Sequence, residues 1–430
     1  MLKVAMLNKQ NKSTYIFQLF MLFLILIFVY GRAFIGVSIF GFRIGELIVA
    51  FSLILTLGAF IDSQFRKSPI DRLMKTQMGF VITFIIITIL TNSSFFESYT
   101  YKSSSYIWTI GYLYLGYIFF QHYKLKTSHL NTLIFIAVLV YFNEISRRIF
   151  SPNFLVEFLT AYSDKPLQNH KGYDLIMVFV ISTFAFLKKM PYKRLTIDIF
   201  ILLSALYLPL IVWKSKGATL GFVFYVISQL IFHSNILRRS LLRNIILLIV
   251  AVLVVFISSV GMTYYESYEV PSEDAIEFVL DHKFSNSNWL FLYIVDGRIY
   301  SDDGNANWRL QIWQDVIEDS VQEQSYIYGI GYKNKIPAME DPSRSGRDGT
   351  NENVHNFLIN NYARGGIVHL LLTAYFFGLI LFKRDAKDWT RLIFVMPFLI
   401  TSFFGASMES AHFPAVFYFF LASFFTDSFD

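Results

Sequence analysis

Runs of apolar residues, separated by short polar segments, recur along nearly the whole chain. A run of roughly 20 apolar residues crosses the hydrocarbon core of a bilayer as a helix. About 12 such runs predict an all-α polytopic membrane protein, although several are shorter than this length and their boundaries are approximate. The predicted spans cover residues 15–30, 44–61, 78–90, 106–120, 130–142, 173–187, 197–212, 217–232, 242–263, 356–382, 392–404 and 412–426.

The polar segments between the spans predict the orientation of the chain. Lys and Arg are concentrated in alternate segments, which are residues 1–14, 62–77, 121–129, 188–196, 233–243 and 383–391. Cytoplasmic loops carry such an excess of basic residues. With an even number of spans, both the N-terminus and the C-terminus are then predicted to be cytoplasmic.

The spans divide the chain into three parts. Residues 1–263 hold the first nine predicted spans, residues 264–355 form one large, acidic extracytoplasmic loop, and residues 356–430 hold the last three spans. A loop of this length is usually functional or disordered. We expect it to contain helix and to carry the chemistry of the protein.

Composition excludes several classes of protein. With 55% hydrophobic and 16% charged residues, the chain has too little charge for a soluble protein of this size. Its basic residues mark cytoplasmic loops, so we expect no nucleic-acid partner. The chain has no Cys, which excludes disulfides, thiolate zinc sites and Cys nucleophiles. No HExxH, Walker or GxSxG motif is present, and we expect no metal and no cofactor.

The segment "NANWRLQIWQDVIEDSV" of the large loop predicts a helix from Asn305 to Val321. Arg309, Trp313, Val316 and Ile317 then share one face. An Arg on an apolar face needs an anion, and its planar donors suit phosphate or carboxylate. The alternative is an Arg that packs over Trp313 or pairs with an acid of the loop.

Two more outward segments carry cations beside the membrane. "VWKSKGATLGF" is predicted to be a tight turn that places Lys214, Ser215 and Lys216 at the outer surface. Such cations are functional candidates, or they interact with lipid phosphate. "GFRIGELI" places Arg43 and Glu46 at the outer end of the second span, where they either meet a substrate or neutralise each other.

His355 follows the large loop, and Asn356 starts the next helix. A lone His at a membrane surface is often structural. Here the predicted topology places it on the same side as Arg309, Lys216 and Arg43. A general base beside several cations suits group transfer from a phosphate leaving group. Arg364 lies further along the helix and is expected to face another partner, while His369 is expected to be packed in the core.

The order of these motifs resembles the O-antigen ligase and polymerase superfamily of bacterial inner membranes. The resemblance rests on the "SKG" turn, "WRLQIW", "GIGYKN" and above all "HNFL…RGGI", and it covers roughly residues 205–385. It implies a GT-C-like membrane glycosyltransferase. Such an enzyme uses saccharides linked to undecaprenyl diphosphate, needs no metal and inverts the anomeric carbon.

The resemblance also implies roles for individual residues. His355 matches the base and Arg309 matches the loop arginine that binds the diphosphate. Lys216 stands where the family usually has Arg, which keeps the charge but loses the bidentate geometry. Arg43 would be a further contact to the diphosphate or the lipid. Substrate contacts are also expected from Lys214, Ser215, Asn356 and Glu409, although Glu409 could instead pair with His412.

Three functions remain open at this point. A polymerase would extend a lipid-linked repeat unit of O-antigen or capsule, and we favour it because the loop is acidic. A ligase would transfer the glycan to lipid A-core. A transporter of lipid-linked oligosaccharides is the alternative from another class, but it would concentrate polar groups at the midplane. Besides lipids and the lipid-linked donor, a chain-length regulator is a candidate partner. Because a base must be neutral, activity is expected to fall below about pH 6.

Overall fold

The structure is a computed structural model that describes residues 2–62, 65, 67–146, 152–163, 170–189, 194–238, 240–267, 292–344, 351–382 and 389–426. Parts of the large loop, of segment 143–172 and of the basic segments 62–77, 188–196, 233–243 and 383–391 lie outside these residues. In the part that is described, the chain is almost entirely helical, with two antiparallel hairpins.

A helix is found at every predicted span. These helices are α1 (Leu2–Ile35), α2 (Ile44–Ile61), α3 (Asp71–Leu90), α5 (Ser105–Trp108) with α6 (Gly111–His122), α7 (Thr127–Ser146), α9 (Gly172–Lys189), α10 (Arg194–Lys214), α11 (Lys216–Phe232), α13 (Leu241–Ser267), α16 (Phe357–Leu381), α17 (Trp389–Phe403) and α18 (His412–Leu421) with η4 (Ala422–Phe425). The remaining elements are short, apart from α15: α4 (Ser98–Ser103), α8 (Asn153–Tyr162), α12 (Ser234–Leu237), α15 (Gly304–Gln322), η2 (Pro337–Met339), η3 (Pro342–Arg344), β1 (Ser38–Ile39), β2 (Phe42–Arg43), β3 (Leu292–Val295) and β4 (Arg298–Ser301).

The structure confirms a mostly helical membrane protein but not the exact number of spans. Within the described residues, 7 helices are long and apolar enough to cross a membrane, and three more apolar helices, α11, α17 and α18 with η4, are shorter. The span predicted at 106–120 is divided between α5 and α6. The count of about 12 therefore stays a prediction.

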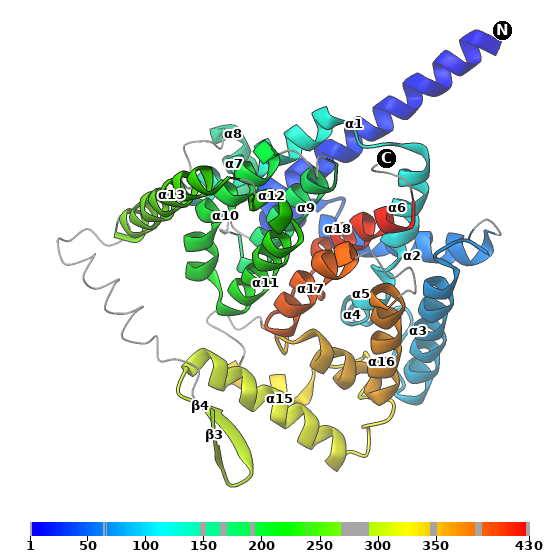
Figure 1. Cartoon of the computed structure of the whole chain (residues 1–430). Coiled ribbons are helices and arrows are strands. Elements are labelled where there is room, and N and C mark those ends of the chain that lie inside the picture. The colour runs from blue at the N-terminus through cyan, green and yellow to red at the C-terminus, as the bar shows by residue number, and fades with distance from the viewer. Residues whose placement is uncertain are drawn as a thin grey trace.

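Helix α9 lies at the centre of the bundle (Figure 1). All of its residues from 172 to 187 are buried, as expected for a helix that is apolar on every side. Phe179 packs against Phe200, Tyr207 and Phe222 of the neighbouring helices α10 and α11, with ring centroids 4.9–6.1 Å apart. By contrast, only 6% of the apolar window of α13 is buried inside the protein.

Helix α16 is interrupted at Gly366, whose φ of 62° lies in the left-handed region. The break frees backbone amides, and segment 326–330 supplies acceptors for them. The amide of Ile367 donates to the carbonyl of Tyr326 at 2.9 Å. Because backbone polar groups inside a membrane protein need internal partners, this segment and the helix form one unit. Residues 357–365 become a short helix in front of the longer, membrane-crossing part.

Helix α15 and the β3–β4 hairpin lie together at one end of the bundle, beside the start of α16 (Figure 1). The predicted helix is confirmed, but the prediction that Ile317 shares its apolar face is wrong. Ile312 and Val316 are buried, whereas Ile317 is 45% exposed. The buried face is set by the partners that α15 meets, which are η2 and the first turns of α16. The small core that they share consists of Ile312, Val316, Ile336, Ala338, Met339, Val354 and Ala363.

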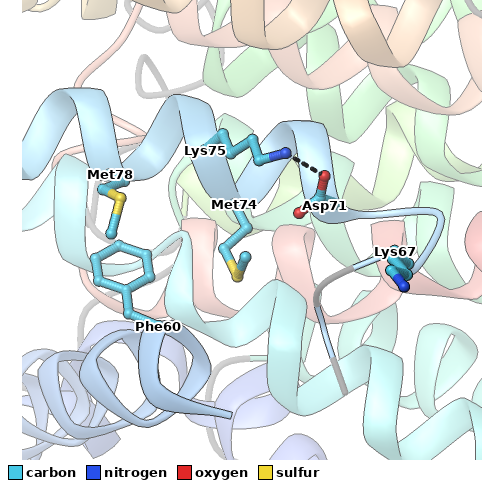
Figure 2. A pocket seen from close by; sticks show the side chains of 6 residues that line it. All are labelled: Phe60, Lys67, Asp71, Met74, Lys75 and Met78. Carbon is cyan, nitrogen blue, oxygen red and sulfur yellow. Dashed lines mark hydrogen bonds and ion pairs between the residues drawn. The ribbon is translucent and has the colours of Figure 1, made fainter. Parts of the chain in front are cut away.

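A pocket of about 350 Å³ lies between the end of α2 and the start of α3. Figure 2 shows Phe60, Met74 and Met78 along one part of it, and Asp71 bonded to Lys75 at its rim. The other end of α3 meets segment 326–334, because Gly331 packs on Thr91. A helix of this length spans roughly 30 Å. The pocket is therefore far from the end of the bundle that carries α15.

The break in α16 can be tested with one methyl group. An added Cβ on Gly366 would overlap the carbonyl of Ile327, and the residue would have to keep its positive φ. We expect Gly366→Ala to lower the Tm of the purified protein by roughly 5 °C or more. Gly378→Ala in the same helix is the control, because an added Cβ there has no atom within 4 Å. Equal Tm values for the two variants would contradict this account.

Candidate functional site

His355 is held in a left-handed backbone conformation, with φ of 56°. Its neighbours on both sides are fixed. The indole of Trp313 donates to the carbonyl of Val354 at 2.7 Å, and Asn356 caps α16. The ring of Trp308 lies against the imidazole, with centroids 5.3 Å apart. A non-glycine residue with this φ costs on the order of 1–3 kcal/mol and is typical of functional sites.

The electrostatic environment of His355 is strongly positive. Burial, together with the charges of Arg309, Lys171 and Arg32, lowers its pKa from 6.5 to about 3. The imidazole is therefore neutral at any physiological pH, as a general base must be. The expected loss of activity below pH 6 assumed an ordinary His pKa, and the lowered pKa of His355 does not support that assumption for the free protein.

Arg309 lies on α15, next to Trp308, and is partly buried. One guanidinium nitrogen donates to the carbonyl of Phe404 at 2.6 Å, while its Nε has no hydrogen-bond partner among the described residues. Burial lowers the pKa of Arg309, and Asp303 opposes this shift. A guanidinium with open donors at the rim of a positive site can hold an oxyanion.

Lys216 forms an ion pair with Asp303, the residue that caps the start of α15. The second oxygen of Asp303 accepts from the amide of Ala306 at 2.8 Å. The lysine side chain is 64% exposed and the aspartate only 10%. Although burial opposes it, the bond from Lys216 helps to lower the pKa of Asp303. This pair joins the start of α11 to the start of α15.

Lys214 and Ser215 have structural partners. The ammonium of Lys214 lies 2.6 Å from a carboxylate oxygen of Glu144, and both side chains are largely buried. The other oxygen of Glu144 accepts from the backbone and the ring of His170, at 3.0 and 2.9 Å. Ser215 caps α11 by accepting from the amide of Ala218 at 3.3 Å. Both side chains thus hold the turn in place.

Asn356 and Arg43 both stand at the start of helices. The side chain of Asn356 is buried and accepts from the amides of Leu358 and Ile359, so it occupies the end of α16 itself. Arg43 is exposed at the end of the β1–β2 hairpin, and its amide donates to Glu46 at 3.0 Å. The structure brings Arg309 and His355 together.

Glu409 lies in the loop between α17 and α18. Burial raises its pKa from 4.5 to about 8, although Arg364 opposes the shift, and Oε1 has no hydrogen-bond partner among the residues described. The alternative of a pair with His412 is wrong, because His412 bonds to Asp174 at 2.8 Å. At neutral pH the carboxyl is mostly protonated and can donate a hydrogen bond.

Two expectations about α16 are confirmed. Arg364 is buried and donates to the carbonyls of Gly331 and Asn334, at 3.1 and 2.6 Å, so it holds the "GIGYKN" turn on the helix. His369 is fully buried and bonds to Tyr106 at 2.6 Å and Thr83 at 2.8 Å.

Three residues around His355 were not predicted from the sequence, namely Arg32, Lys171 and Trp308. Each of the two cations stands beside a glycine, in "GR" and "KG", as Lys216 does. That pattern is the only signal in the sequence that could have indicated them. In the part of the chain described, no group of three or more His, Asp or Glu side chains could hold a metal ion.

Comparison with known families identifies the part of the chain that carries most of this site. The model of a family described as O-antigen ligase matches residues 199–374, which include Lys216, Arg309 and His355. A search of curated proteins found no match to the chain. Arg32, Lys171 and Glu409 lie outside the matched segment.

Glu409 gives a test of the site's electrostatics. The pKa of Glu409 is higher in the folded protein than in the unfolded chain. The folded protein therefore loses stability as pH rises from 4.5 to about 8, because the unfolded chain releases this proton first. Gln cannot ionise. We therefore expect the Tm of Glu409→Gln to exceed that of the wild type by a margin that grows over this range, in a thermal melt at several pH values. Glu323→Gln serves as the exposed control, and a constant margin would contradict the raised pKa.

Proposed function

We propose that the chain, which belongs through residues 199–374 to the O-antigen ligase and polymerase superfamily, is a membrane glycosyltransferase. Its donor would be an oligosaccharide on a polyprenyl diphosphate, in the bacterial inner membrane, with the α15 end of the bundle facing outward. One observation carries this proposal: a neutral His355 stands within the field of Arg309 and two further cations. A base and an anion-binding group are the two parts that such a transfer needs.

The proposed step uses each group at a defined atom. A ring nitrogen of His355 takes the proton of the acceptor hydroxyl as its oxygen bonds to the anomeric carbon. The bond from that carbon to the diphosphate oxygen breaks, and the electron pair leaves with the diphosphate. Arg309 stabilises the growing negative charge, and Lys216 contributes when the anion competes with Asp303 for it. Attack opposite the leaving group inverts the anomeric carbon.

The low pKa of His355 fits this order of events. A base with a pKa of about 3 is weak in the free protein. A bound diphosphate offsets the charges that lower the pKa, so the imidazole becomes more basic only when the donor is present. The acceptor is therefore activated in the donor complex and not before it.

Among the possible acceptors, we propose a second lipid-linked repeat unit, which makes the protein a polymerase of O-antigen or capsule. The large loop is rich in acidic residues and offers no basic patch suited to a phosphorylated core. Transfer to lipid A-core is the ligase alternative. The transporter alternative is less well supported, because Arg309, His355 and the Lys216–Asp303 pair lie at α15, which stands at one end of the bundle (Figure 1).

Replacing the base gives the first test of this function. We expect His355→Asn to abolish glycan transfer while leaving the Tm within a few degrees, because Asn also tolerates a positive φ. The saccharide of a strain that carries only the variant is analysed on a gel. Single-repeat cores would indicate a polymerase, and bare cores a ligase. The control is His122→Asn, at an exposed His of α6. An unchanged ladder removes His355 from the mechanism.

The pH dependence gives a second test. The pKa of His355 in the free protein is about 3, so kcat/KM should not fall between pH 7 and 5 on account of this residue. The fall of kcat at acidic pH reports the pKa of His355 in the donor complex. It should occur at higher pH than the acidic fall of kcat/KM. An identical acidic fall of both parameters would contradict a base that gains strength on donor binding.

A further inference from the structure

We propose that Arg32 and Lys171, two cations from the N-terminal half of the chain, form with Arg309 the wall that binds the donor's diphosphate. The proposal rests on the function proposed for His355, and it assigns residues that lie outside the segment matched by the family model.

Close backbone contacts bring these cations together. An added Cβ on Gly31 would lie 3.4 Å from the ring of His170, so Arg32 stands beside the segment that carries Lys171. An added Cβ on Gly172 would lie 2.6 Å from the Cβ of Ser215. The segments of Arg32, Lys171 and Lys216 are therefore in direct contact, one after the other.

The same series of contacts continues to Arg309. Gly217 packs so closely on Phe404 that a methyl group would overlap its side chain. The carbonyl of Phe404 accepts from Arg309. Arg309 is followed in space by Trp308 and His355, whose rings pack on each other. Three segments that are far apart in the sequence thus bring Arg32, Lys171 and Arg309 near one histidine, and the segment of Lys216 connects them.

A buried network fixes the first two cations. Helix α1 is kinked at Gly31, with φ of 45°, and the kink is stabilised by a bond of 2.8 Å from the ring of His170 to the carbonyl of Phe28. His170 is held in turn by Glu144, and Glu144 by Lys214. This network determines where the backbone of Arg32 and Lys171 lies, so Glu144 acts as a positioning residue.

Charge balance indicates why Arg309 needs this help. A diphosphate between a lipid and a sugar carries one negative charge on each phosphate and gains another when it leaves. Lys216 is neutralised by Asp303, so it adds little net charge. Asp174 interacts electrostatically with Arg32 and accepts from the amide of Lys171, so it offsets part of their charge. Arg32 and Lys171 nevertheless bring positive charge towards His355 from outside the matched segment.

The electrostatics of His355 support the same placement. Burial is the main reason that its pKa is low, and the charges of Arg309, Lys171 and Arg32 lower it further, which agrees with the contacts between their segments. Removing either cation should thus raise the pKa of His355. A residue with only a structural role would not produce this shift.

The binding test uses purified full-length protein in detergent, with inorganic pyrophosphate and farnesyl diphosphate as probes. We expect Arg32→Gln and Lys171→Gln each to raise the Kd of both probes by roughly tenfold, as loss of a charge-assisted contact does. Arg32→Lys and Lys171→Arg should restore most of the affinity. Arg72→Gln, an exposed cation at the start of α3, is the matched control and should leave both Kd values unchanged.

Each outcome decides between the proposals. Unchanged Kd values in Arg32→Gln and Lys171→Gln, or no binding of either probe by the wild type, overturn the diphosphate wall. A loss of affinity that the conservative variants fail to restore, together with a lowered Tm, also overturns it in favour of a structural role. If His355→Asn leaves the saccharide unchanged while Arg32→Gln weakens pyrophosphate binding, the wall stands and the transferase proposal falls.

A second readout follows His355 directly. The rate at which diethylpyrocarbonate modifies this residue, measured by mass spectrometry over a range of pH, reports the fraction of neutral imidazole. Removal of Arg32 or Lys171 should move the midpoint of that curve to higher pH. A midpoint that stays fixed in both variants contradicts the proposal.

Discussion

The interrupted backbone of α16 determines how the functional end of this protein is built. A helix that breaks inside an apolar bundle must find partners for its freed amides, and segment 326–330 provides them. Arg364, two residues before the break, donates to the carbonyls of Gly331 and Asn334 in the "GIGYKN" turn. The chain between α15 and α16 is therefore anchored at both ends. His355 lies at the end of that connecting segment, just before α16, so its position depends on the break.

The second constraint is the cost of placing several cations in a partly buried site. The protein neutralises the ones that hold elements together, namely Lys216 by Asp303 and Lys214 by Glu144. It leaves donors of Arg309 open, and that residue lies beside the histidine. A site of this kind is stable when empty only because its base is neutral, and it gains most from a ligand with more than one negative charge.

The apolar pattern was sufficient to place every helix of the bundle, because a run of apolar residues has few other stable solutions in lipid. It does not confirm the number of crossings, because several apolar helices, such as α11, α17 and α18, are shorter than a bilayer requires. The face of α15 was predicted correctly at Val316 but not at Ile317, since the neighbours that select it are supplied by the tertiary fold.

The candidate site was predictable in part. His355 and Arg309 stood out because each departs from its local pattern, as a His where a helix begins and an Arg on an apolar face. Arg32 and Lys171 did not stand out, because a single cation at the end of a span looks the same whether it meets lipid or substrate. The partner of Lys214 is an acid on α7, about 70 residues earlier, and no local pattern connects such positions.

The exposed side of α13 has a practical consequence. One side of this helix packs on α10, but only 6% of its apolar window is buried within the described residues. Harsh detergent would replace the lipid around this side long before it reaches the buried α9. Reconstitution into nanodiscs is therefore the safer preparation, since lipid acyl chains cover the apolar surface that the rest of the polypeptide leaves open.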